Sequence, residues 1–507
     1  MVVRKISYYR VIVSLCLFMF LLSPVFGDEI SAVSFDKELP ENNIVTIQPD
    51  SLRILHNPLT GWVLYASMGV DAADFWAQYD HMYIPELGHN VSVTDYAHTL
   101  YIRASWTDFN PQEDVYGWKI DSNLRAYIEG AYQRNMRLAF RVVVDSRDKR
   151  TEFTPQFVKD AGAKGFMNKG KWSPYSDDPV FQKYYTKFVK ALAKDFNDPS
   201  KVEFIDGFGL GKWGEYHTMI YSTGDDTPKK AVFDWVTDIY SQAFDKVPVV
   251  INYHRWIGAG KDWVDDEHFA ADSEEMLEGA IKKGYSLRHD AFGMTTYYGS
   301  WERRFAKKYR NICPIIMEGG WIVKSHSYWQ DPRGYRKDSH EDVRRGEFDD
   351  SKEAHVNMMD FRFGDTESWF KDAFDLVRRF LREGGYRLYP SEISLPLEVS
   401  KKTTPTIKHC WNNLGWGYCP TNIPQWNQKY KVAFALLDSE TNEARYTFVD
   451  TDTDLSKWIK GSPVEYVFEP DMSKVETGTY VWAVGLVDRS NKDLIGLDIA
   501  AKGVISS

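Results

Sequence analysis

The sequence lacks a surplus of positive charge and lacks long apolar runs, and each lack excludes a class of protein. Its 62 Lys and Arg residues stand against 72 Asp and Glu, which gives a formal net charge of −10. Nucleic-acid binding needs a basic surface, so we expect no nucleic-acid partner. No apolar run beyond Leu22 is long enough to cross a bilayer, so no membrane span is expected in the mature chain.

Cysteine is also scarce, with four residues in 507. None of them stands in the Cys/His spacing of a zinc site, so no metal is expected. Cys410 and Cys419 are close enough in sequence to close a small loop, and the sequence leaves open whether they form a disulfide. Cys313 lies in an apolar run, where a buried free thiol is expected.

The N-terminus has the pattern of a leader peptide. Basic residues precede the apolar run from Val11 to Leu22, and the small residue Gly27 stands just before Asp28. We therefore predict a cleaved signal peptide over residues 1–27 and a secreted or periplasmic protein. A retained anchor is the alternative, and a lipoprotein is less expected because no convincing lipobox precedes Cys16.

Short β-rich runs alternate with longer helical patterns from about residue 60 to residue 385. This alternation predicts an α/β fold with a parallel sheet, and it continues long enough for a closed (β/α)8 barrel, or TIM barrel. An open Rossmann-like sheet is the alternative, but no Gly-rich phosphate loop follows the early strands. The eight expected strands are Gly61–Ser67, Thr99–Arg103, Leu138–Val144, Val202–Gly207, Val247–Tyr253, Asp290–Thr295, Cys313–Met317 and His355–Phe361.

Helical periodicity ends at Pro390, and apolar residues then alternate with their neighbours, as from Tyr430 to Leu436. This pattern predicts a small immunoglobulin- or fibronectin-like β-sandwich. A structural role is favoured over polysaccharide binding, because three tryptophans suit the sandwich core: Trp416, Trp458 and Trp482. The expected domains are an N-terminal extension over residues 28–50, the barrel over 51–390 and the sandwich over 391–507.

Two glutamates stand where a barrel places its chemistry, at the C-terminal ends of strands. Glu215 follows the fourth strand among glycines and aromatics, and Glu318 directly follows the seventh. Glycosidic cleavage with retention needs one carboxyl to protonate the leaving oxygen and another, about 5 Å away, to attack the anomeric carbon. Strands four and seven lie on opposite sides of the barrel, so we predict Glu215 as acid/base and Glu318 as nucleophile. For either residue alone, a loop salt bridge is the alternative.

This arrangement resembles glycoside hydrolase clan A, whose members carry the acid/base after strand four and the nucleophile after strand seven. The resemblance covers about residues 51–385 and implies a retaining glycosidase that acts on a β-linked oligo- or polysaccharide and needs no cofactor. In that clan an asparagine usually precedes the acid/base, whereas Gly214 stands here. By the same resemblance, Tyr297 and Arg103 are expected to contact the nucleophile. Further substrate-binding candidates at strand ends are Trp106, Trp213, His254 and Trp321.

The chain also resembles a group of β-galactosidase-like secreted bacterial proteins that join a barrel to a β-sandwich. The resemblance rests on an Asn-Pro-x-x-Gly motif at residues 57–61, a Gly-x-Trp-Gly-Glu turn at 211–215, and a C-terminal domain that contains Asn413, Gly415, Trp416, Trp458 and Gly461. It implies carbohydrate processing without naming a sugar.

Two other functions stay open. A glycan-binding protein that has lost turnover would keep the same barrel, and Gly214 favours it slightly. A metal-dependent hydrolase would use residues that lack a compact ligand motif: His217, His254, His289 and Asp290. The sequence does not define the sugar, exo or endo action, or the oligomeric state.

Overall fold

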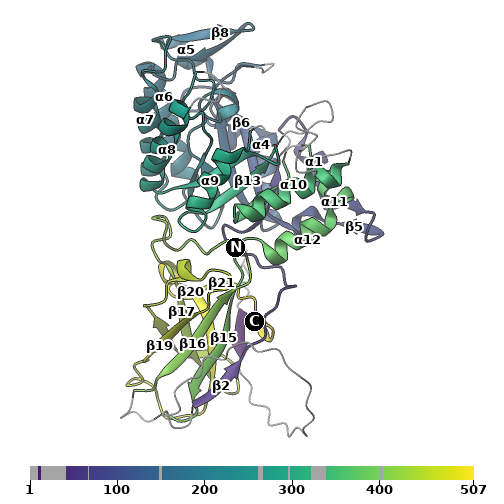
Figure 1. The fold of residues 1–507 in the computed structure, drawn as a ribbon, viewed down its shortest axis with the longest axis vertical. Coiled ribbons are helices and arrows are strands. Elements are labelled where there is room, and N and C mark those ends of the chain that lie inside the picture. Colours follow the sequence, from purple (N-terminus) through teal and green to yellow (C-terminus); the bar gives the residue numbers. More distant parts are fainter. Residues whose placement is uncertain are drawn as a thin grey trace. The chain divides into compact units, whose positions relative to one another are not determined.

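The computed structural model describes residues 9–12, 42–66, 68–147, 151–260, 267–294, 297–320, 339–362, 364–399 and 404–506. Of the expected leader, only Tyr9–Ile12 is therefore described, and Trp321 lies outside the described residues. The chain forms two compact units. The barrel unit comprises residues 56–386 and 415–427, and the sandwich unit comprises residues 1–55, 387–414 and 428–507 (Figure 1).

Eight parallel strands close into a barrel in chain order, which confirms the predicted fold class. The strands are β3 (Gly61–Tyr65), β6 (Ala97–Ser105), β7 (Arg137–Val143), β10 (Val202–Asp206), β11 (Val249–Asn252), β12 (Tyr285–Phe292), β13 (Ile315–Gly319) and β14 (Met358–Asp360).

The sixth strand differs most from its prediction. It was expected over Asp290–Thr295 but begins five residues earlier, at Tyr285. The prediction followed apolar character, whereas Arg288 and Asp290 lie within the strand and are buried. Charged residues interrupt the apolar run by which a barrel strand is recognised in a sequence. In β12 these charged residues belong to the candidate site described below.

Helices cover the outside of the barrel, and Figure 1 shows α6, α7 and α8 side by side. In α6, Asp178 caps the N-terminus by accepting the Phe181 N–H at 2.8 Å, and Pro179 occupies the first turn. The helices of this unit are α1 (Ala72–Asp80), α2 (Trp106–Phe109), α3 (Gly117–Ile120), α4 (Ser122–Gln133), α5 (Gln156–Asp160), α6 (Pro179–Phe196), α7 (Lys229–Ala243), α8 (Glu267–Lys282), α9 (Ser300–Tyr309), α10 (His340–Glu353), α11 (Thr366–Asp372) and α12 (Phe374–Glu383).

Two short hairpins are added to the barrel, one from β4 (Met82–Ile84) and β5 (His89–Val91), the other from β8 (Gly165–Asn168) and β9 (Lys171–Pro174). Part of the segment expected in the sandwich also belongs to this unit. Trp416 is buried against Phe348 and Phe380, and its indole donates to the Val356 carbonyl at 2.9 Å. The expectation that Trp416 lies in the sandwich core is therefore wrong.

The sandwich unit consists of antiparallel strands in two sheets. One has the order β19-β16-β15-β2, and the other has the order β18-β17-β20-β1-β22 with β21 beside β20. The strands are β1 (Tyr9–Ile12), β2 (Asn42–Thr46), β15 (Leu388–Pro396), β16 (Ile407–Asn413), β17 (Tyr430–Asp438), β18 (Ala444–Asp450), β19 (Val464–Phe468), β20 (Tyr480–Asp488), β21 (Leu494–Leu497) and β22 (Val504–Ser506).

The sandwich core contains Trp411 and Trp458, whose rings stack with centroids 4.7 Å apart. The expected N-terminal extension contributes β2 to this unit, a role the sequence did not indicate. Cys410 and Cys419 are not joined in a disulfide, and Cys313 is a buried free thiol. Among the described residues, no helix has the length and apolar character needed to cross a membrane.

Candidate active site

The barrel interior contains charged side chains toward the C-terminal ends of its strands. Strand register brings Arg103, Arg141 and Asp206 into one row across β6, β7 and β10, and it pairs Asn252 of β11 with Arg288 of β12. Arg141 and Arg288 are fully buried. Because barrels carry their active sites at the C-terminal ends of strands, this charged layer is the candidate active site.

Glu215 lies on a tight loop that follows β10. The loop passes through left-handed backbone at Gly209 and Gly214, with φ of 72° and 77°. A Cβ on Gly209 would meet the Val142 carbonyl oxygen at 2.2 Å, so this position requires glycine. The turn brings the Glu215 side chain back into the barrel, where it is 6% exposed.

The Glu215 carboxyl is surrounded by polar side chains from β7 and from the loops that follow β10 and β12. His217 Nε2 lies 3.3 Å from Oε2, the Tyr297 hydroxyl donates to the same oxygen at 3.5 Å, and Arg141 Nη1 lies 3.8 Å from Oε1. Burial, followed by the charge of Asp290, raises the pKa of Glu215 to about 8, although nearby arginines oppose this shift. This shift favours the protonated form of Glu215 at neutral pH.

Glu318 is the second-to-last residue of β13 and is 3% exposed. Arg288 Nη2 donates to its Oε2 at 2.7 Å, and Arg141 Nη2 lies 3.8 Å from the same oxygen. Burial and then Asp290 raise the pKa of Glu318, against the opposing effect of the two arginines. One guanidinium, that of Arg141, thus contacts both glutamates.

Below and beside the glutamates lies a network of buried ion pairs. Arg141 Nε donates to Asp206 Oδ2 at 2.8 Å, and its two terminal nitrogens bind Asp290, with Nη2 to Oδ1 at 2.9 Å. Arg288 Nη2 also donates to Asp360 Oδ2 at 2.9 Å. The sequence did not single out Arg141, Asp206, Arg288 or Asp360, although charges within buried strands were a usable signal.

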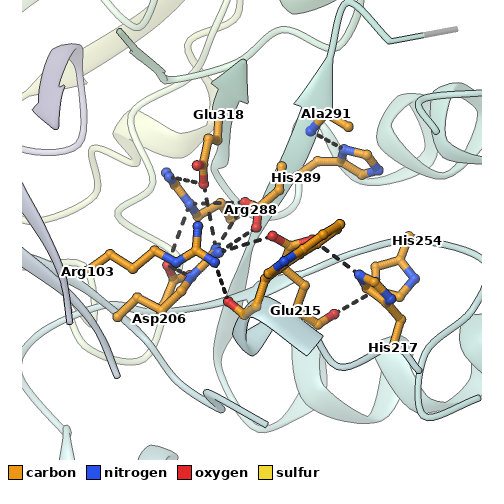
Figure 2. Close-up of polar contacts among 12 residues, drawn as sticks. Arg103, Asp206, Glu215, His217, His254, Arg288, His289, Ala291 and Glu318 are labelled. Carbon is orange, nitrogen blue, oxygen red and sulfur yellow. Dashed lines mark hydrogen bonds and ion pairs between the residues drawn. The ribbon is translucent and has the colours of Figure 1, made fainter. Parts of the chain in front are cut away.

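His254 acts on Glu215 through the backbone. Its Nε2 donates to the Glu215 carbonyl at 2.7 Å, and its Nδ1 accepts the Trp256 N–H at 3.1 Å. Burial and nearby His217 lower the pKa of His254 to about 3, so the ring is neutral at working pH. Figure 2 shows Glu215 lying toward His217 and His254, and Glu318 lying toward Arg288.

The other expected site residues divide into two groups. Arg103 donates to the carbonyl of Trp213, in the Glu215 loop, at 2.8 Å, and the Tyr297 hydroxyl donates to Glu215. Both residues were expected to contact the nucleophile, whereas these hydrogen bonds connect them to the expected acid/base and its loop. Trp106 does not lie beside this loop: it is fully buried and packs against Phe181 and other rings of α6. Its expected role in substrate binding therefore has no support from its position.

The described residues contain no cluster of His, Cys, Asp and Glu arranged to hold a metal ion. His289, which the metal hypothesis included, points away from the barrel interior toward aromatic rings, with Tyr253 and Tyr298 at centroid distances of 5.0 Å. Its Nδ1 accepts the Ala291 N–H at 3.1 Å. The carboxylates that remain inside the barrel are paired with arginines.

No known family and no curated protein matches the chain. Similar solved structures include a GH30 endoxylanase from Clostridium papyrosolvens C71, at 10% identity and a TM-score of 0.38, covering 86% of this chain and 98% of that one. Endo-glycoceramidase II from Rhodococcus sp. is 12% identical with a TM-score of 0.37, covering 87% and 99%. The Pseudomonas stutzeri endoglucanase Cel5A is 10% identical with a TM-score of 0.38, covering 64% and 94%. Identities this low carry no information on the activity of this chain.

Proposed function

We propose that this chain is a retaining glycoside hydrolase with Glu215 as acid/base and Glu318 as nucleophile. The observation that carries the proposal is the pair of buried glutamates at the ends of β10 and β13, both in contact with Arg141. A carboxyl that keeps its proton near neutral pH is what an acid catalyst needs, and burial supplies this for Glu215.

The reaction would proceed in two displacements. Glu318 attacks the anomeric carbon while the Glu215 proton moves to the glycosidic oxygen, which leaves as the alcohol. Glu215, now a carboxylate, takes a proton from water, and the oxygen of that water displaces Glu318 from the sugar. Arg288, at 2.7 Å, orients the Glu318 carboxylate and stabilises its charge. This two-carboxylate mechanism requires no metal or organic cofactor.

The pH dependence follows from the two glutamates. Glu215 must be protonated, so kcat/KM is expected to fall as pH rises through about 8. Glu318 must be ionised, so activity is also expected to fall as pH is lowered. Because the pKa of Glu318 is raised, this acid limb should lie at a higher pH than the value of about 4.3 usual for glutamate. The profile should be a bell whose limbs belong to the coupled pair, with its alkaline limb near pH 8.

The test is hydrolysis of aryl β-glycosides (galactoside, glucoside, mannoside, xyloside, arabinoside and glucuronide) by wild type, Glu215→Ala and Glu318→Ala. We expect wild type to cleave at least one of them and Glu318→Ala to lose activity that azide restores. Glu203→Gln is the matched control, since Glu203 is a buried barrel glutamate that binds Arg137 and the Leu59 N–H, away from both catalytic residues.

Two results would contradict the proposal. Activity that survives both alanine substitutions would exclude the two-glutamate mechanism. Glycan binding on an array without turnover of the aryl panel or of the bound glycan would instead favour a binding protein built on the same barrel.

We also propose that the chain is secreted, on the basis of the N-terminal pattern alone. The structure pairs Tyr9–Ile12 with β20 and β22, so cleavage after Gly27 would remove one strand from that sheet. N-terminal sequencing of the protein recovered from its native host decides this. A start at Asp28 supports a cleaved leader, and a start at Met1 means that β1 is retained.

A further inference from the structure

Asp290 is a third carboxylate in the site. It lies in β12 and is 9% exposed, and it shares the Arg141 guanidinium with both glutamates: Nη1 lies 3.8 Å from Glu215 Oε1, and Nη2 lies 3.8 Å from Glu318 Oε2. Arg141 binds both of its oxygens. The three carboxyl groups therefore form one cluster around the terminal nitrogens of Arg141, with Asp290 bound directly to both nitrogens.

Asp290 is poorly placed to attack a sugar or to donate a proton. Both of its oxygens are engaged by Arg141, and a carboxylate held in this way loses nucleophilicity because its lone pairs bind N–H groups. It is suited instead to remain ionised beside Glu215 and Glu318, whose protonation states the proposed mechanism depends on.

We propose that Asp290 is a positioning residue that shares the Arg141 guanidinium with Glu215 and Glu318 and sets the pH range in which one is protonated and the other ionised. This inference rests on the proposed function of the same site. It adds a fixed negative charge, placed by Arg141, to the two-glutamate mechanism.

The charges around the cluster support this role. Three arginines face five carboxyl groups inside the barrel: Arg103, Arg141 and Arg288 against Asp206, Glu215, Asp290, Glu318 and Asp360. If the three aspartates are ionised, they balance the three arginines. No net positive charge is then left to favour ionisation of the glutamates.

The pKa shifts of Asp290, Glu215 and Glu318 have the directions expected from this charge balance. Although burial opposes its ionisation, Arg141 and Arg288 hold the pKa of Asp290 well below its usual range, whereas Asp290 contributes to the raised pKa of both glutamates. Other titratable groups that face the cluster are Tyr65, Tyr101, His217, His254 and Tyr297.

The experiment compares wild type, Asp290→Asn, Asp290→Glu and Asp206→Asn. Asp206 is the matched control because it is a buried aspartate bound to the same arginine, but through Nε and not through the terminal nitrogens that lie near the two glutamates. Two quantities are measured against pH: kcat/KM, and the infrared C=O band of the protonated Glu215, assigned by its loss in Glu215→Gln. The infrared titration needs no substrate.

We expect Asp290→Asn to move both limbs of the kcat/KM bell, and the loss of the Glu215 band, to lower pH by about 1 unit or more. Asp290→Glu should keep the wild-type positions, and Asp206→Asn should shift them far less than Asp290→Asn. Circular dichroism confirms that each variant is folded. If Asp290→Asn is unfolded, the band is titrated instead in Asp290→Glu, which keeps the carboxylate, and in Arg141→Lys, which no longer holds both of its oxygens. A shift of the band titration to lower pH is then expected in Arg141→Lys and not in Asp290→Glu.

The two proposals fail differently. Unchanged pH limbs and an unchanged band in folded Asp290→Asn would overturn the role of Asp290 while leaving the glycosidase intact. A wild-type protein that cleaves no glycoside would overturn the function, and the infrared shift would still decide whether Asp290 controls the protonation of Glu215.

Discussion

Gly214 occupies the place where clan A enzymes usually have an asparagine, and its backbone shows what the site tolerates there. Its φ of 77° is left-handed, but an added Cβ would lie 3.4 Å from Val143 Cγ2, an ordinary contact. The constraint at this position is therefore conformational and not steric. Asparagine adopts left-handed backbone more readily than other residues with a side chain.

We expect Gly214→Ala to lower the free energy of unfolding by about 1 kcal/mol and Gly214→Asn to lower it by less. Urea denaturation measures both. Gly209→Ala is the steric control and should cost more, because its Cβ would meet the Val142 carbonyl oxygen at 2.2 Å. Equal losses for alanine and asparagine at position 214 would contradict the conformational explanation.

At the residue scale, the sequence predicted the two glutamates but not their partners. Glu215 and Glu318 could be found because strand ends are where a barrel displays functional groups. Arg141 and Arg288 lie within strands, where a charged residue reads as an interruption of an apolar pattern. His254 was predicted to bind substrate, whereas its contact with the Glu215 carbonyl depends on loop geometry that no local pattern contains.

At the scale of elements, the fold was largely predictable because strand-helix alternation is a local signal repeated eight times. The sixth strand was misplaced by its charged residues, and β2 was missed because an edge strand far from its partners in sequence has no distinctive pattern. The barrel also takes a segment, residues 415–427, from beyond the expected boundary at Pro390. Long-range packing decides such membership, and a single sequence does not show it.

Arg141 ties three barrel strands together, since it extends from β7 to Asp206 on β10 and Asp290 on β12. Replacing it with methionine would leave two buried aspartates with only the longer ion pairs to Arg288, at 3.5 Å and 3.6 Å. We expect Arg141→Met to lower the free energy of unfolding by about 3 to 5 kcal/mol. The measurement is urea denaturation followed by tryptophan fluorescence.

The control for Arg141 removes the stranded charges together with the cation. The triple variant Arg141→Met, Asp206→Asn, Asp290→Asn should recover a large part of the lost stability, because no uncompensated charge remains buried. A single variant as stable as wild type, or a triple variant less stable than the single one, would show that the strands are held mainly by other contacts.

At the scale of the whole molecule, two units with separate cores predict two unfolding transitions, and one tryptophan in each unit can assign them. Trp416 packs in the barrel unit against Phe348 and Phe380, and Trp458 stacks on Trp411 in the sandwich unit. Both are at least 96% buried, at 4% and 0% exposure, so each alanine substitution should cost about 3 to 5 kcal/mol in its own unit.

Differential scanning calorimetry of the full chain therefore should show Trp416→Ala lowering the midpoint of one transition and Trp458→Ala lowering that of the other. The same assignment predicts that a chain ending at Pro390 loses barrel stability comparable to Trp416→Ala, since it lacks the segment that carries this side chain. If Trp416→Ala and Trp458→Ala lower the midpoint of the same transition by the same amount, the two units unfold as one. Residues 415–427 then do not stabilise the barrel independently of the sandwich.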